Sequence, residues 1–243
     1  LMIAYGALGT VNYLSVVFPP ASRWPMNSIL SVLIIVIVMI INILGIKASA
    51  RFNLSLLMID LLGIMTLLVL GYYVVINHGA TMPRLSFNLF NPDYLAHGLA
   101  YSLRGYTGID VIAQSTGEAM APFISVPRAI ISVSALSTVV ALLLSLLTVL
   151  SGALTIVSNN VGDPIGALAK YLLHNNMYVS TYISVSIAIV LLISVNAGIV
   201  DFSRSIYVMS EDELLPSRLS SVHGRYRTPY LAIITSSLIA MLF

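Results

Sequence analysis

The sequence contains no cysteine and very few charged residues. Without cysteine the chain has neither disulfides nor thiolate metal sites, and its four histidines are too scattered for metal-ligand spacing. Only 8% of the residues are charged, against about 25% in soluble domains, whereas 58% are hydrophobic. A formal net charge of +2 is too small to indicate nucleic-acid binding. These shortages exclude an ordinary soluble domain and predict a membrane protein.

Apolar runs long enough to cross about 30 Å of hydrocarbon divide the chain. We expect seven membrane segments, at residues 1–18, 26–45, 52–77, 94–118, 130–157, 178–209 and 230–243. Pro122 and Pro127 precede the fifth segment and are expected to end a helix and to stiffen a loop. A short interfacial helix is expected over residues 165–173. Because the first and last segments are short, we expect an internal piece of a longer transporter-sized protein.

Basic residues are distributed unevenly between the loops on the two sides of the membrane, and this bias sets the orientation. The richer side is expected to be cytoplasmic and carries Lys47, Arg51, Arg128, Arg204, Arg218, Arg225 and Arg227. The other side carries only Arg23, Arg84 and Lys170. No loop suggests a separate soluble domain, so residues 1–243 are expected to form a single multi-pass transmembrane domain in the cell membrane.

The fourth segment contains residues that a lipid-facing helix would avoid. Residues 104–110 read Arg-Gly-Tyr-Thr-Gly-Ile-Asp, and each glycine weakens a helix by about 1 kcal/mol relative to alanine. Unwound backbone is tolerated in a membrane only where it lines a cavity or is buried in protein. Gly105 and Gly108 can instead allow close helix packing. Arg104 and Asp110 favour unwinding, because ionisable groups at membrane depth usually mark a pathway or a buried pair.

Three further motifs occur in order along the chain. They are NILGIK from residue 42, EAMAP with VPRAI between residues 118 and 130, and MSEDELLP from residue 209. Together with residues 104–110 they resemble the amino acid-polyamine-organocation (APC) superfamily of transporters. The resemblance implies an all-α polytopic membrane helix bundle with the inverted-repeat, leucine-transporter-like fold. This chain would supply the third helix through the start of the ninth.

In that superfamily the first and sixth helices unwind at mid-membrane and hold the substrate through backbone groups. The fourth segment resembles the sixth helix, so the resemblance implies a substrate site that includes Arg104, Gly105, Tyr106, Thr107 and Gly108. Relatives commonly have an aromatic residue at the position of Arg104. The arginine is expected to pair with Asp110, since an unpaired buried guanidinium is costly, or else to recognise an acidic substrate group.

Asp60 lies near the middle of the third segment, with no other charge within eight residues on either side. An intramembrane carboxylate is functional by default, although a protonated, hydrogen-bonded structural role is the alternative. Many superfamily members carry a lysine thirteen residues after the position that Lys47 matches, and in this chain that position is Asp60. The resemblance therefore implies that Asp60 takes part in coupling to an ion.

The sixth segment places Ser194, Gly198 and Asp201 on one helical face, which is expected to line the cavity. The resemblance places Ser194 near the ion site and Asp201 two turns closer to the cytoplasm. We therefore expect Gly198 to belong to the substrate site. The residues expected to couple transport to an ion are Asp60, Ser194, Asp110 and Asp201. Simple hydrogen bonding between helices remains the alternative for the serine and for nearby Asn196. In the first segment, Tyr5, Asn12 and Tyr13 are weaker candidates for substrate contact.

The resulting functional hypothesis is secondary transport of amino acids or related amines by alternating access. Coupling to protons or sodium, or exchange, would drive it, with no cofactor and no enzymatic reaction. An intramembrane aspartyl protease using Asp60 and Asp110 is the alternative, but its Tyr-Asp and Gly-x-Gly-Asp signatures are missing. An ion channel is a third possibility, although no symmetric filter or acidic ring is evident in the sequence.

Overall fold

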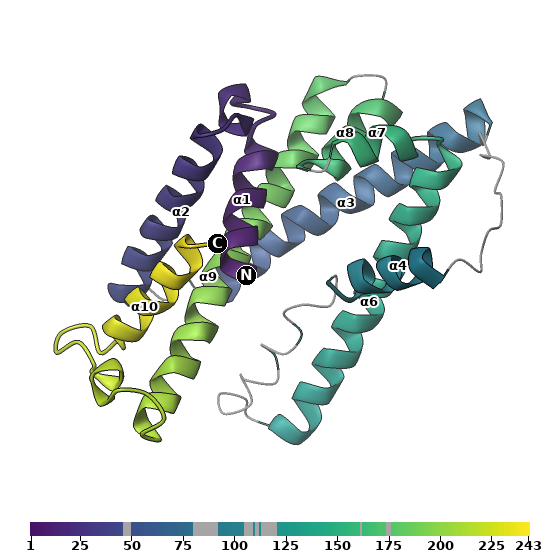
Figure 1. The fold of residues 1–243 in the computed structure, drawn as a ribbon. Helices are drawn as coiled ribbons and strands as arrows, with labels where there is room; N and C mark the ends of the chain where they lie inside the picture. Colours follow the sequence, from purple (N-terminus) through teal and green to yellow (C-terminus); the bar gives the residue numbers. More distant parts are fainter. Residues whose placement is uncertain are drawn as a thin grey trace. The chain divides into compact units, whose positions relative to one another are not determined.

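The computed structural model describes residues 1–45, 50–79, 92–104, 109, 112, 121–160, 162–173 and 176–243. All regular elements in these residues are helices, which confirms the predicted all-helical fold class (Figure 1). They are α1 (Met2–Leu14), η1 (Pro19–Ser22), α2 (Met26–Ile43), α3 (Ala50–His78), α4 (Pro92–Arg104), α6 (Pro122–Leu150), α7 (Leu154–Asn159), α8 (Pro164–Leu172), α9 (Met177–Glu211), η3 (Ser217–Ser220) and α10 (Tyr230–Met241). Helices α2, α3, α6 and α9 are long and apolar enough to cross a membrane.

The chain divides into two compact units. Unit 1 comprises Leu1–Leu70 and Ile156–Phe243, and unit 2 comprises Gly71–Thr155. In unit 2 the Tyr72 hydroxyl donates a hydrogen bond of 2.9 Å to the carbonyl of Leu143, which connects the end of α3 to α6. Unit 1 contains most of the residues that the sequence singles out and that the structure describes.

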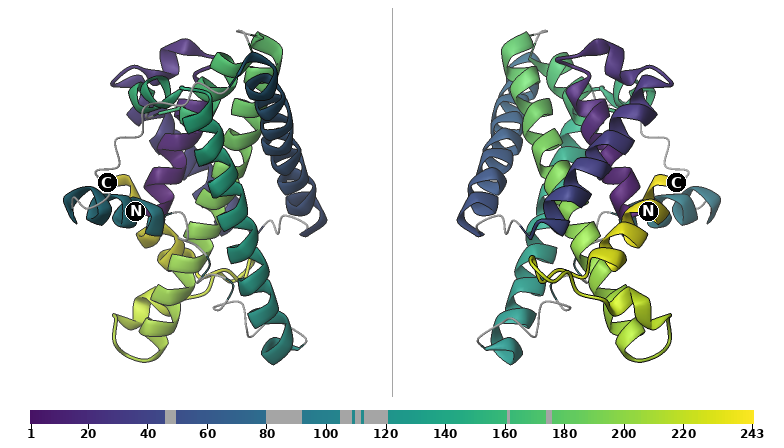
Figure 2. Two further views of the ribbon diagram at one scale, coloured as in Figure 1. Left: turned by 90° about the vertical axis from the view of Figure 1, so that its right-hand side faces the viewer. Right: turned by 90° about the vertical axis from the view of Figure 1, so that its left-hand side faces the viewer.

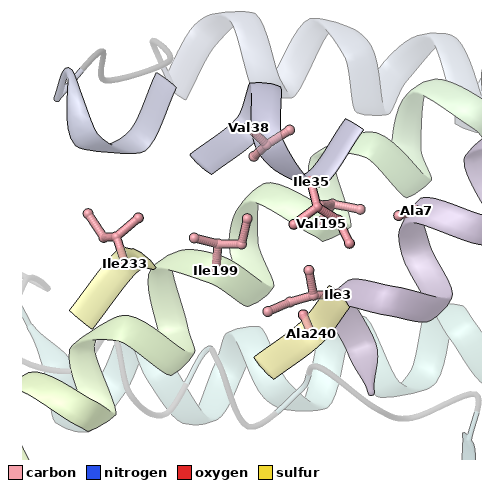
Figure 3. Close-up of a cluster of buried hydrophobic side chains, with 8 residues drawn as sticks. All are labelled: Ile3, Ala7, Ile35, Val38, Val195, Ile199, Ile233 and Ala240. Carbon is pink, nitrogen blue, oxygen red and sulfur yellow. The ribbon is translucent and has the colours of Figure 1, made fainter. Parts of the chain in front are cut away.

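The core of unit 1 is a cluster of buried aliphatic side chains from four helices (Figure 3). It consists of Ile3 and Ala7 from α1, Ile35 and Val38 from α2, Val195 and Ile199 from α9, and Ile233 and Ala240 from α10. Figure 2 shows α1 and α9 side by side. Because lipid tails are as apolar as these side chains, close van der Waals packing rather than exclusion of water holds the helices together.

Helix α2 presents its apolar side chains outward. Ile29, Leu33, Ile37 and Ile40 are all exposed, as expected of residues that face lipid. The helix has 18 residues, which at 1.5 Å per residue corresponds to about 27 Å, close to the thickness of a hydrocarbon core. The two ends of α2 therefore lie near the two membrane interfaces.

The expected limits of the fifth segment, 130–157, are wrong at both ends. Helix α6 begins at Pro122, which starts a helix readily because the first helical residue needs no N–H group. Pro127 lies inside the helix near its start, rather than in a loop. At the other end α6 stops at Leu150, and Gly152 adopts a φ of +72°, a left-handed conformation that glycine adopts easily. Helix α8 confirms the short helix expected over 165–173.

Candidate functional site

Helices α1 and α9 approach each other closely because glycines lie where they meet. A Cβ atom on Gly6 would lie 2.9 Å from Val195 Cγ2, and one on Gly198 would lie 2.9 Å from Ile3 Cγ1. Carbon atoms prefer separations of about 3.5–4.0 Å, so neither position has room for a side chain. Gly198 is thus buried against α1, and its assignment to the substrate site stays a prediction.

Asp60 lies in the part of α3 that can span the membrane, and it is only 9% exposed. One turn further along α3, a Cβ on Gly63 would lie 2.6 Å from Ser186 Oγ of α9. The Tyr182 hydroxyl of α9 donates a hydrogen bond of 3.2 Å to the carbonyl of the residue before Asp60. Asp60 is therefore buried beside the contact between α3 and α9. Within the described residues, nothing donates a hydrogen bond to its carboxylate.

Three polar side chains of α1 named from the sequence differ in their surroundings. Tyr13 is 7% exposed, and its phenol interacts electrostatically with Asp163 and, more weakly, with Asp60. Asn12 Oδ1 accepts a hydrogen bond of 2.7 Å from Asn27 Nδ2, which ties α1 to α2. Tyr5, by contrast, is 54% exposed. Among these three candidates, Tyr13 is therefore the one that shares a buried region with Asp60.

Ser194 and Asp201 are half-buried on α9. The contacts around Asp60 involve an earlier part of the same helix, at Tyr182 and Ser186. The described structure does not bring Asp60 into hydrogen-bonding contact with Ser194. A joint role of these residues in coupling stays a prediction.

The motif residue Asn42 connects two membrane helices. Its side-chain amide donates hydrogen bonds of 2.8 Å to Asn196 Oδ1 and of 2.9 Å to the carbonyl of Val38. The first bond joins α2 to α9, and an amide inside a membrane helix is costly unless such a partner is available. The alternative assigned to Asn196, hydrogen bonding between helices, is confirmed.

The expected substrate loop lies largely outside the described residues. Helix α4 ends at Arg104, whose side chain the structure does not describe. Gly105, Tyr106, Thr107, Gly108 and Asp110 also lie outside. The unwinding of this segment and the pairing of Arg104 with Asp110 stay predictions.

A cleft that the sequence did not predict opens beside α8, and we call it the α8 cleft. Its volume is about 750 Å³, within the usual range for sites that bind small molecules. It is lined by Ser15, Val16, Pro19, Ile156, Asn160, Asp163, Gly166, Ala167, Lys170, Tyr171, Met177, Ser180 and Ser184. One carboxylate, one ammonium group and three serine hydroxyls give it a polar lining suited to water and small polar solutes.

Asp163 fastens α8 to α9 at the edge of this cleft. Its Oδ1 accepts a hydrogen bond of 2.8 Å from the N–H of Gly166 and so caps α8, while Oδ2 accepts one of 3.1 Å from the Ser184 hydroxyl of α9. Burial raises the pKa of the Asp163 carboxyl, and these two donors oppose the rise. The sequence analysis did not single out Asp163; an Asp-Pro pair at 163 and 164 could have indicated the helix start, but the contact with Ser184 depends on the tertiary fold.

Comparison with known proteins gives concordant matches. A family model described as "Amino acid permease" matches residues 1–243. An uncharacterised transporter of Rhizobium meliloti (strain 1021) is 29% identical over 210 residues, covering 83% of this chain and 43% of that protein. A methylthioribose transporter of Bacillus subtilis (strain 168) is 28% identical over 190 residues, covering 76% of this chain and 39% of that protein. The chain therefore spans less than half the length of the curated relatives it matches.

Proposed function

The chain belongs to the amino acid permease family, and we propose that it forms part of a secondary transporter for amino acids or related amines. Family membership identifies a transporter rather than an enzyme, which makes the aspartyl protease hypothesis wrong. Together with the apolar helices, it identifies a multi-pass membrane protein that acts on a small molecule. Alternating access as a symporter or antiporter is our proposal for the mechanism.

The main support for ion-coupled transport is the burial of Asp60 in a helix that can span the membrane. A carboxylate held there at 9% exposure, beside a helix contact and without a donor from the described residues, is costly to keep charged. If water or a cation reaches the Asp60 carboxylate in only one access state, the free-energy cost of its charge is lower in that state than in the other. We therefore place proton or sodium coupling at Asp60, with Ser194, Asp110 and Asp201 as the other candidate groups.

The substrate site in this proposal is formed by residues 104–108, whose sequence is that of a broken helix, together with Gly198. If Arg104 pairs with Asp110, Arg104→Ala alone should impair transport more than the double change with Asp110→Asn, since the single change leaves a carboxylate unpaired. If Arg104 instead binds an acidic substrate, Arg104→Ala should abolish glutamate uptake and spare neutral amino acids. Uptake assays with both classes of substrate separate the two roles.

A second candidate substrate comes from one relative's name. That protein is described as a methylthioribose transporter and is 28% identical to this chain. Methylthioribose is an uncharged thioether sugar and offers neither the carboxylate nor the ammonium group of an amino acid. The two candidates therefore differ in the groups that the unwound backbone would have to bind.

Counterflow into proteoliposomes tests the proposed function directly. The purified transporter is reconstituted into vesicles preloaded with an unlabelled mixture of amino acids, and entry of a labelled amino acid is measured against protein-free vesicles. A second set of vesicles is preloaded with methylthioribose and given labelled methylthioribose. Transient accumulation of labelled amino acid supports the proposal. Accumulation of methylthioribose alone would support the second candidate, and the absence of both would contradict secondary transport of either solute.

A further inference from the structure

The loop between η3 and α10 forms a rigid turn, which we call the 223–228 turn. The N–H of His223 donates to the carbonyl of Thr228, and the N–H of Arg227 donates to the carbonyl of His223, each at 2.9 Å. His223 Nδ1 accepts from the N–H groups of Arg225 and Tyr226 at 3.2 and 3.3 Å. The His223 ring also packs on Tyr226, with centroids 4.9 Å apart. The backbone of this turn is therefore fixed by its own contacts.

The 223–228 turn is attached to the end of α2. The Thr228 hydroxyl donates a hydrogen bond of 2.8 Å to the carbonyl of Ile43, the last residue of that helix. Gly45 follows α2 with a φ of +68°, a left-handed conformation that glycine adopts easily, and it lies close to Thr228 Cγ2 and to the carbonyl of Tyr226. Because α2 spans about one hydrocarbon thickness, this attachment places the turn at the membrane interface.

Two arginines of the turn lie within reach of lipid headgroups. Arg225 and Arg227 are exposed, and neither forms an ion pair within the described residues. They are at most three residues from Thr228, so their backbones lie within about 10 Å of the backbone of Thr228, whose side chain is bonded to the end of α2. The polar region of a bilayer extends roughly 5–8 Å beyond the hydrocarbon on each side, and extended arginine side chains can reach it.

The surroundings of the two arginines are those of an interfacial surface. Tyr226 lies between them and is 37% exposed, and the Arg225 guanidinium lies 5.7 Å from the centre of its ring. Val222, just before the turn, is exposed as well. Tyrosine with apolar neighbours is enriched at the level of lipid headgroups. Arg227 is held at a φ of +53°, a conformation that non-glycine residues adopt only when their surroundings fix it.

We propose that Arg225 and Arg227 of the 223–228 turn bind the phosphate of an anionic lipid, such as phosphatidylglycerol, in the leaflet that contacts this end of the protein. Two guanidinium groups on a fixed backbone complement a phosphodiester, and arginine binds phosphate through paired N–H groups. The acidic run Glu211 to Glu213 lies where α9 ends, and the Glu211 carboxylate accepts a hydrogen bond of 2.7 Å from the Tyr207 hydroxyl. This inference does not depend on the transported solute.

Native mass spectrometry of the purified transporter with equimolar phosphatidylglycerol and phosphatidylcholine tests the proposal. The wild type should bind phosphatidylglycerol preferentially. In the variant Arg225→Gln/Arg227→Gln, the preference for phosphatidylglycerol over phosphatidylcholine should fall by about 25-fold. Each arginine near an anionic surface contributes about fivefold, and the variant removes two. Arg225→Lys/Arg227→Lys keeps both charges but loses the paired N–H groups, so its preference should lie between those of the wild type and of the glutamine variant. This intermediate value keeps the test informative even if the glutamine variant folds poorly.

The control variant Arg23→Gln/Arg218→Gln removes the same charge from other exposed positions. It should lose less than about fivefold, since both of its arginines lie outside the 223–228 turn, Arg218 in η3 and Arg23 far away in the sequence. An equal loss in this control, or an unchanged preference in the glutamine variant, would overturn the proposal. A soluble probe, glycerol 3-phosphate, distinguishes the source of the phosphate. Displacement of the lipid by this probe at equal concentration would indicate a site for a free anion instead.

Discussion

Replacement of Gly198 by alanine distinguishes close helix packing from substrate binding at this position. The new methyl group would lie 2.9 Å from Ile3 Cγ1, which belongs to a side chain that is only 4% exposed. Carbon atoms prefer about 3.5–4.0 Å, so α1 and α9 would have to separate by roughly 0.6–1.1 Å at this contact or distort nearby side chains. Packing therefore predicts a loss of stability whose size depends on Ile3.

The magnitude follows from two opposing effects. Overpacking a tight contact costs about 1–3 kcal/mol, whereas alanine in place of glycine favours a helix by about 1 kcal/mol. Gly198→Ala should therefore lower the free energy of unfolding by about 0–2 kcal/mol in the wild-type background. In an Ile3→Ala background the overlap disappears, and the same change should raise stability by about 1 kcal/mol. The sign of the effect is thus expected to reverse between the two backgrounds.

Thermal unfolding of the four purified proteins in detergent measures this reversal, and uptake kinetics are recorded on the same samples. Gly98→Ala in α4 is the matched control, because nothing lies within 4 Å of a Cβ at that position. It should be neutral or stabilising by up to about 1 kcal/mol. If Gly198→Ala has the same effect on stability in both backgrounds, the packing argument is refuted. A changed KM without any change in stability would instead support substrate binding at Gly198.

Three further predictions concern other contacts of unit 1. Burial raises the pKa of the Asp163 carboxyl above its usual value of 3.8. The contribution of this carboxyl to stability is therefore largest at pH values below 3.8, and it is lost as pH rises through the higher pKa of the folded state. The unfolding midpoint of the wild type should accordingly fall relative to that of Asp163→Asn as pH increases from about 4. Asn42→Ala and Asn196→Ala should show a coupling of about 0.6 kcal/mol, and at most about 1.7, in a double-mutant cycle of unfolding, because they share one hydrogen bond inside the membrane. His223→Ala should lower stability by about 1 kcal/mol through loss of the acceptor for two backbone N–H groups, whereas His223→Asn, which can accept from the same groups, should lose less in the same assay.

The helices could be predicted from the sequence because each has a strong local signal. Apolar runs of membrane-spanning length located α2, α3 and α9 to within a few residues. The short helix α8 was also expected, within one residue of its observed limits. The start of α6 was missed because proline was taken as a stop signal, although it is equally suited to the first turn of a helix.

Contacts between distant segments were not predictable from a single sequence. The hydrogen bond from Ser184 to Asp163 joins residues 21 positions apart, and the bond from Asn42 to Asn196 joins residues 154 apart. Gly198 is a second example. The helical face on which it lies could be inferred from the spacing of residues, but the sequence did not show that Ile3 packs against it. Asp60 stood out because charge is rare at membrane depth, and its burial beside α9 agrees with that reasoning.

The central claim is that Asp60 couples transport to an ion gradient. Asp60→Asn keeps the size and most of the hydrogen-bonding capacity of the side chain but removes its ability to ionise. Uphill accumulation of labelled substrate is measured in proteoliposomes under an imposed proton or sodium gradient, next to exchange at equal substrate concentrations. The exposed residue Asp212, changed to asparagine, provides the control. We expect Asp60→Asn to lose accumulation while exchange survives and Asp212→Asn retains both, whereas unimpaired accumulation by Asp60→Asn under either gradient would contradict the account.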